Sequence, residues 1–154
     1  MLNKMLLFTT LALMAFLVGC ARPLPSSSDP QPLPSPRADW TMTLTQSGGF
    51  AGIMLKVVVS SDGKLTAENQ RSGHTVTQEL TADTVARLES LSSGLVVATP
   101  ASHSGCADCF SYDLRVDARG RSLQIHADDT TLADSGAEDL IRALQGLRDA
   151  ALRS

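Results

Sequence analysis

The sequence has few aromatic residues and no excess of positive charge. The first shortage limits the composition of a folded core, and the second limits the classes of partner that the protein can bind. One tryptophan, one tyrosine and four phenylalanines in 154 residues mean that a folded core must consist mainly of aliphatic side chains. Thirteen basic residues stand against sixteen acidic ones, without the basic stripe that nucleic-acid binding requires. No GxSxG or similar nucleophile elbow surrounds a serine, so we assign no catalytic triad and do not expect an enzyme.

A run of apolar residues long enough to cross a membrane is also missing near the N-terminus. The apolar segment Met5–Val18 has 14 residues, whereas a spanning helix needs about 20. Lys4 precedes this segment, and Gly19 and Cys20 follow it. A positive residue followed by a short apolar run is typical of a signal peptide, and the plainest alternative is an ordinary secretory leader in which the cysteine is accidental.

The segment ends in Leu17-Val18-Gly19-Cys20, which resembles the lipobox of bacterial lipoproteins. The resemblance implies cleavage after Gly19, a diacylglycerol on the Cys20 sulfur, and a mature chain held to the membrane on the exported face of the cell envelope. Because Ala21 rather than aspartate follows the cysteine, it also implies the outer membrane if the cell is Gram-negative.

A proline-rich segment separates Cys20 from the rest of the chain. Six of the residues 21–37 are prolines, with serines among them, and such a composition stays extended and forms no core. At about 3.1 Å per residue it could hold a folded unit roughly 50 Å from the lipid. We therefore divide the chain into a signal peptide (1–19), a lipidated cysteine with its linker (20–37) and one folded domain (38–154).

The domain begins with segments that have the pattern of strands. Residues 40–46 alternate between apolar side chains and threonines, which predicts a half-buried strand. Residues 53–60 and 65–70 predict two more, joined by a hairpin turn at Asp62-Gly63. After a loop over 96–108, the alternation of residues 110–117 predicts another strand, and its return strand follows a turn at 118–120.

Two segments have the pattern of helices. Thr81 is placed to cap a helix that ends at Gly94, and a closing helix has an apolar face of Leu140, Ile141, Leu144, Leu147 and Ala151. The predicted order is β-β-β-α-β-β-α, without the βαβ crossovers of a parallel sheet. We therefore expect an α+β fold in which helices pack on one face of an antiparallel sheet.

Two cysteines remain when Cys20 carries lipid. Cys106 and Cys109 are an even pair in an exported chain, which favours a disulfide. A redox-active pair would need the first cysteine at a helix N-terminus, but this pair leads into a strand. A zinc site would need more ligands than His103 supplies. We expect a structural disulfide, no metal and no cofactor, with a metal- or redox-active protein as the alternative.

A second polar cluster lies in the run His126-Ala127-Asp128-Asp129. A histidine and two carboxylates could bind a cation, whereas a solvated strand end is the simpler interpretation. Because Leu123 and Ile125 are expected to point into the core, His126 should point away from it.

The loop Gly48-Gly49-Phe50-Ala51-Gly52 is the most unusual stretch of the domain. Its three glycines permit positive φ and close approach of the backbone to a neighbour. Phe50 either folds back onto the sheet as a plug or projects as an anchor for a partner, since aromatic side chains are favoured as binding hot spots. Packing considerations alone favour the plug.

The stretch TQSGGFAGI, residues 45–53, resembles the SGGFAG signature of emfourin-like proteins, which are small bacterial inhibitors of thermolysin-like zinc metallopeptidases. Residues 108–116 are similar to the aromatic-rich strand of that family. The run His126–Asp129, together with the last helix, is similar to the C-terminal end of the family's proteins. The resemblance implies a partner-binding loop whose Phe50 fills an apolar pocket beside the zinc of a secreted peptidase. The alternative is a scaffold or adaptor lipoprotein that binds another envelope protein without inhibiting it.

Overall fold

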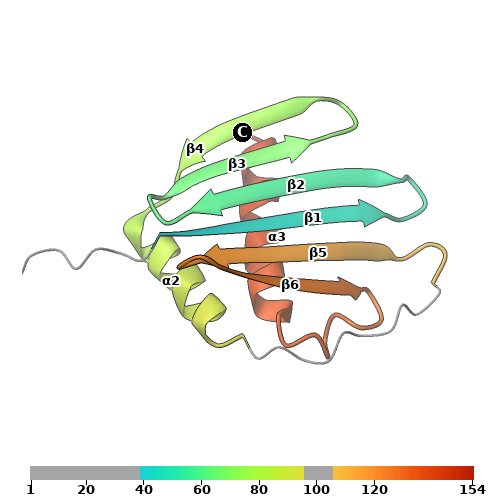
Figure 1. The fold of residues 1–154 in the computed structure, drawn as a ribbon. Helices are drawn as coiled ribbons and strands as arrows, with labels where there is room; N and C mark the ends of the chain where they lie inside the picture. Colours follow the sequence, from blue (N-terminus) through green and yellow to red (C-terminus); the bar gives the residue numbers. More distant parts are fainter. Residues whose placement is uncertain (1–38, 96–105) are drawn as a thin grey trace, which may run out of the picture. The chain divides into compact units, whose positions relative to one another are not determined.

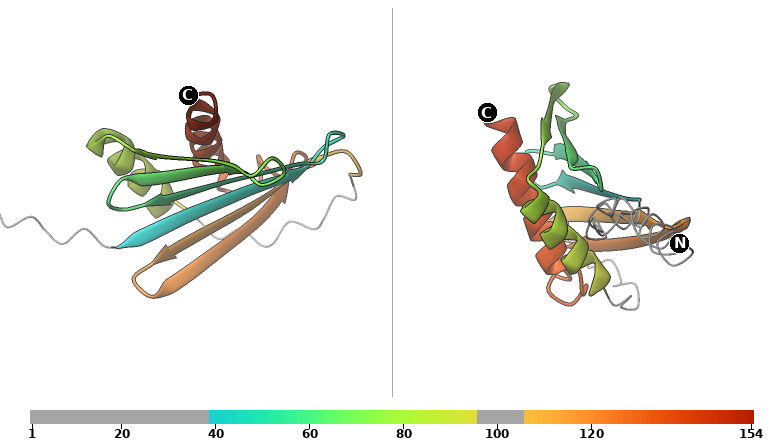
Figure 2. Two further views of the ribbon diagram at one scale, coloured as in Figure 1. Left: turned by 90° about the horizontal axis from the view of Figure 1, so that it is seen from above. Right: turned by 90° about the vertical axis from the view of Figure 1, so that its left-hand side faces the viewer.

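The structure is a computed structural model that describes residues 39–95 and 106–154. These residues form a six-stranded antiparallel sheet, in the order β4-β3-β2-β1-β5-β6, and two helices that lie on one of its faces (Figures 1 and 2). The strands are β1 (Trp40–Gly48), β2 (Ile53–Ser60), β3 (Lys64–Asn69), β4 (His74–Glu79), β5 (Phe110–Ala118) and β6 (Arg121–Asp128), and the helices are α2 (Ala82–Ser93) and α3 (Glu138–Leu152). The predicted α+β class, with helices on one face, is confirmed. The predicted signal peptide, Cys20, the predicted linker and His103 lie outside the described residues.

The strictly alternating segment at the start of the domain is the central strand β1. Trp40, Met42 and Leu44 are buried on the face that the helices cover, and the threonines between them lie on the opposite, open face. β1 pairs with β2 on one side and with β5 on the other, with Leu44 opposite both Val57 and Leu114. This register brings apolar side chains of three strands together in the core.

A fourth strand precedes the first helix, where three strands are expected from the sequence. β4 pairs with β3 from Lys64 opposite Glu79 to Asn69 opposite His74, and it forms one edge of the sheet. The segment HTVTQE was missed because Val76 is its one apolar residue and is only half-buried. An edge strand with little contact to the core does not need the alternation by which strands are recognised.

The two helices begin and end close to where the sequence signals place them. The Thr81 hydroxyl accepts a hydrogen bond from the Thr84 amide at 3.3 Å, and Gly94 caps the C-terminus of α2. α3 crosses the sheet from β1 to β4 and contacts α2. Neither helix in the described part of the chain is long and apolar enough to cross a membrane.

The buried stripe of α3 differs from the predicted one at a single position. Leu140, Ile141, Leu144 and Ala151 are buried as expected, but Leu147 is only half-buried. The next residue, Arg148, is instead 2% exposed. A prediction that assigns only apolar residues to the buried face of a helix leaves an arginine out. The long aliphatic stem of an arginine can nevertheless lie along a core surface.

Candidate functional site

The glycine-rich loop joins β1 to β2 and ends in a tight turn. The Gly52 amide donates to the Gly49 carbonyl at 2.9 Å, which places Phe50 and Ala51 at the tip. Gly48, Gly49 and Gly52 all have positive φ (98°, 69° and 55°), a conformation that side chains disfavour. Phe50 is 97% exposed. The expectation that it folds back as a plug is therefore wrong.

The segment that enters β5 holds the loop on one side. The Gly49 amide donates to the Cys109 carbonyl at 3.2 Å. A Cβ added to Gly48 would lie 2.6 Å from that same oxygen, and one added to Gly49 would overlap the Phe110 ring. Glycine is thus required at both positions by close contact as well as by φ. With the Phe110 ring already against Gly49, Phe50 projects outward.

Arg71 holds the loop on the other side. Its Nη1 donates to the carbonyl oxygens of Ala51 and Gly52, the latter at 2.7 Å. Arg71 lies in the turn between β3 and β4, where the Asn69 side chain accepts hydrogen bonds from the Arg71 and Ser72 amides at 3.2 and 3.3 Å. No sequence pattern marked Arg71, because its contact to the loop spans about twenty residues and depends on the pairing of β2 with β3.

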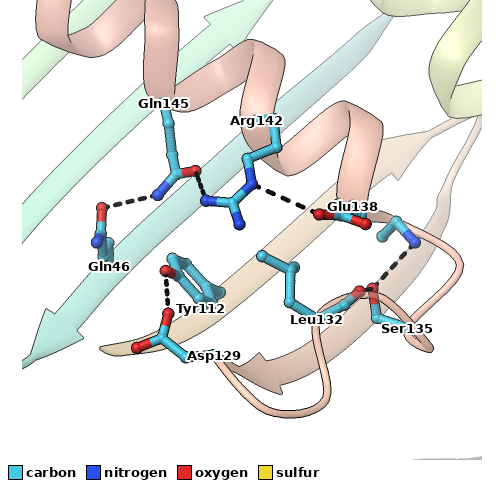
Figure 3. Close-up of polar contacts among 9 residues, drawn as sticks. Gln46, Tyr112, Asp129, Leu132, Ser135, Glu138, Arg142 and Gln145 are labelled. Atoms are coloured by element: carbon cyan, nitrogen blue, oxygen red, sulfur yellow. Dashed lines mark hydrogen bonds and ion pairs between the residues drawn. The ribbon is translucent and has the colours of Figure 1, made fainter. Parts of the chain in front are cut away.

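A polar cluster that includes Gln46, Tyr112, Asp129 and Gln145 lies on the helix side of the sheet (Figure 3). Asp129 accepts from the Phe110 amide at 2.8 Å and from the Tyr112 hydroxyl at 2.7 Å. The Gln145 side chain of α3 donates to the Gln46 side chain of β1 at 3.0 Å. Side chains therefore connect β1 to α3, and β5 to the loop that precedes α3. Both connections lie near the end of the sheet that carries the glycine-rich loop.

The pKa of the Tyr112 phenol is raised above its ordinary value of 10, first by burial and then by the hydrogen bond and charge of Asp129. Folding thus favours the neutral phenol, and this contribution to stability is complete below pH 10 and lost as pH rises through the folded-state pKa. We expect Asp129→Asn to lower this pKa while burial keeps it above the ordinary value. Because the sequence contains one tyrosine, near-ultraviolet absorbance against pH measures the titration directly.

The matched control is Asp134→Asn, which removes the same charge from an exposed position in the same loop. It should leave the Tyr112 titration in place. An unchanged titration curve in Asp129→Asn would show that the carboxylate does not bind the phenol in solution.

Cys106 and Cys109 form the expected disulfide, with their Cα atoms 5.5 Å apart. Within residues 39–95 and 106–154, no three or more His, Cys, Asp or Glu side chains are arranged to hold a metal ion.

The polar side chains of the run His126-Ala127-Asp128-Asp129 do not form one site, because each contacts a different part of the domain. His126 is exposed, as predicted, and its Nδ1 lies 2.6 Å from Asp113 Oδ1 on the open face. Asp128 accepts from the Thr130 and Thr131 amides at 2.9 and 3.0 Å, and Asp129 binds Tyr112. These contacts make the carboxylates structural groups of the loop after β6.

The candidate site is therefore a projection rather than a cleft. A hollow of about 630 Å³ at the opposite end of the sheet is lined by residues such as Trp40, Asp62 and Arg121, and by none of the glycine-rich loop. The protein is thus a small α+β domain, and its candidate site is an exposed aromatic side chain on a loop that hydrogen bonds hold from two sides. No family model matches the sequence, and no curated protein is a significant match.

Proposed function

We propose that this domain is a protein-binding module of an exported, lipid-anchored bacterial protein, and that the loop Gly48–Gly52 is its binding site. The observation that carries the proposal is a 97% exposed phenylalanine on a loop held from both sides. Almost the whole apolar surface of this side chain is available to a partner, and aromatic side chains are favoured as binding hot spots. A loop that is already ordered loses little conformational entropy on binding, so more of the contact energy remains as affinity.

A thermolysin-like zinc metallopeptidase is the partner that we propose. The resemblance of the stretch around Phe50 to the SGGFAG signature supports this choice, and so does the chemistry of the tip. Such peptidases accept a bulky apolar side chain beside the catalytic zinc, a pocket that Phe50 could fill. The tight turn between Gly49 and Gly52 would then occupy the cleft in a conformation unlike the extended strand of a peptide substrate.

The proposal is tested by titrating the protein without its lipid into thermolysin and following the cleavage of a fluorogenic peptide. We expect stoichiometric inhibition. No inhibition at micromolar concentrations would exclude the peptidase as partner. Recovery of a non-peptidase envelope protein by affinity capture would instead support an adaptor.

Arg71 should act on binding through the loop and not by contact with the partner alone. We expect Arg71→Ala to weaken inhibition by about threefold, because loss of the bonds to Ala51 and Gly52 leaves the tip more mobile before binding. Inhibition constants measure this effect. Amide exchange of the loop in the free protein should also become faster, which loss of a direct partner contact alone would not produce.

The matched control is Arg121→Ala, which removes an exposed arginine at the start of β6, at the other end of the sheet. Its inhibition constant should stay at the native value. Equal losses in both variants would point to overall charge and not to the loop.

A further inference from the structure

The disulfide lies on the surface, next to the loop that presents Phe50. Cys106 and the two residues that it encloses with Cys109 are exposed, and Cys109 itself is half-buried. Exposed disulfides exchange with thiols more readily than buried ones, and they are more often regulatory. Cys106 is therefore an exposed residue of the bond, which a thiolate can approach from solvent.

Cys109 also contacts the loop directly through its backbone. Its carbonyl accepts the Gly49 amide and leaves no room for a Cβ on Gly48. The next residue, Phe110, covers Gly49 with its ring and donates its amide to Asp129. The backbone position of Cys109 therefore helps to set the backbone position of the loop.

We propose that Cys106–Cys109 is a site of thiol–disulfide exchange, and that its reduction by a protein dithiol loosens the loop that carries Phe50. The disulfide restricts the backbone on the N-terminal side of β5, since it closes a ring with only Ala107 and Asp108 between its ends. Reduction removes that restriction, and the Cys109 carbonyl then holds Gly49 less firmly. That the loosened loop binds its partner more weakly rests on the function proposed above.

The exchange balances as two thiol transfers. A thiolate of the dithiol attacks Cys106 Sγ, breaks the bond to Cys109 Sγ and forms a mixed disulfide, while the Cys109 thiolate takes up a proton. The second thiol of the reductant then attacks the reductant's first sulfur atom, which is bonded to Cys106 in the mixed disulfide. This step releases the Cys106 thiolate, which also takes up a proton. The protein gains two electrons and two protons, and the dithiol is oxidised to a disulfide.

The Gly49 amide is the direct probe of the first consequence. We would record amide hydrogen exchange by NMR for the native protein before and after reduction with dithiothreitol, without denaturant. The matched internal control is the Gly63 amide, which donates to the Ser60 carbonyl at 2.9 Å in the turn at the other end of β2. Reduction should speed exchange at Gly49 by at least about fivefold and at Gly63 by less than about twofold.

Three results would overturn the proposal. The first is a disulfide that the dithiol cannot reduce in the folded protein, shown by the absence of two newly alkylated thiols. The second is unchanged exchange at Gly49 after reduction. The third is equal acceleration at both amides, which would make the disulfide a general stabiliser. The double variant Cys106→Ser with Cys109→Ser should reproduce the reduced state and show no response to dithiothreitol.

This exchange experiment contains no partner, so its outcome does not depend on whether a peptidase is inhibited. Inhibition constants of the oxidised and reduced protein then test the second consequence. A loosened loop with unchanged inhibition would locate the failure in the proposed function and not in the exchange site.

Discussion

Replacing Phe50 by alanine is expected to weaken the proposed peptidase inhibition at least tenfold, or about 1.4 kcal/mol. The side chain is 97% exposed, so it makes little contact within its own domain and its apolar surface is available to a partner. Aromatic residues at the centre of interfaces are the usual hot spots. For the same reason the free energy of unfolding should change by no more than about 0.5 kcal/mol. Inhibition constants and urea unfolding measure the two quantities separately.

Met54→Ala is the matched control, because Met54 is the other large apolar side chain that is exposed among the described residues, at 45%. It lies on β2 just beyond the loop. We expect it to weaken inhibition by less than about threefold. An unchanged inhibition constant for Phe50→Ala would remove Phe50 from the mechanism. A larger loss from Met54→Ala would move the binding site from the loop tip to the sheet.

Replacing Arg148 by methionine is expected to stabilise the domain by about 1–4 kcal/mol. The arginine side chain is 3% exposed and pairs with Asp149 at 2.7 Å, and its Nη1 has no hydrogen-bond partner among the described residues. Methionine keeps much of the apolar stem without the cost of burying a charge. Since the Asp149 side chain is 43% exposed, removing the arginine leaves no buried carboxylate unpaired. Urea unfolding curves with equal slopes would give the difference directly.

Arg142→Met is the control on the same helix, because that arginine side chain is 56% exposed and its ion pair with Glu138 is long, at 3.7 Å. Its effect should stay within about 0.5 kcal/mol. A loss of stability in Arg148→Met of more than about 1 kcal/mol would show that the buried guanidinium is fully satisfied in solution and contributes to the fold.

The elements that could be predicted from the sequence are those whose local residue pattern matches their surroundings in the folded domain. The alternation along β1 follows from a strand with one covered and one open face, and the hairpin at Asp62-Gly63 follows from turn chemistry. There the Asp62 carboxylate accepts from the Ser60 hydroxyl at 2.5 Å and the Lys64 amide at 3.1 Å. These bonds, the one from Ser60 foremost, lower the pKa of Asp62. β4 gave no comparable signal because it lies at an edge and buries little.

The candidate site was only partly predictable for the same reason. The glycines indicated an unusual backbone, but the direction of Phe50 depends on the Phe110 ring, which comes from sixty residues later and lies against Gly49. Arg71 acts through a contact with a loop about twenty residues earlier in the chain, and Arg148 is buried against the core. Neither residue differs, in its local sequence, from an ordinary surface arginine.

The position of β1 has a mechanical consequence. Trp40 begins the strand and Gly48 ends it, next to the tip, so nine residues separate the point where the chain enters the sheet from the loop, roughly 27 Å at the rise of an extended strand. A tether attached before residue 39 and a partner pulling on Phe50 would load β1 along its own axis. Pairs with β2 and β5 flank nearly its whole length, so many ladder hydrogen bonds would share the force in shear instead of opening one after another. Tension applied between these two ends would therefore not unfold the domain from an edge.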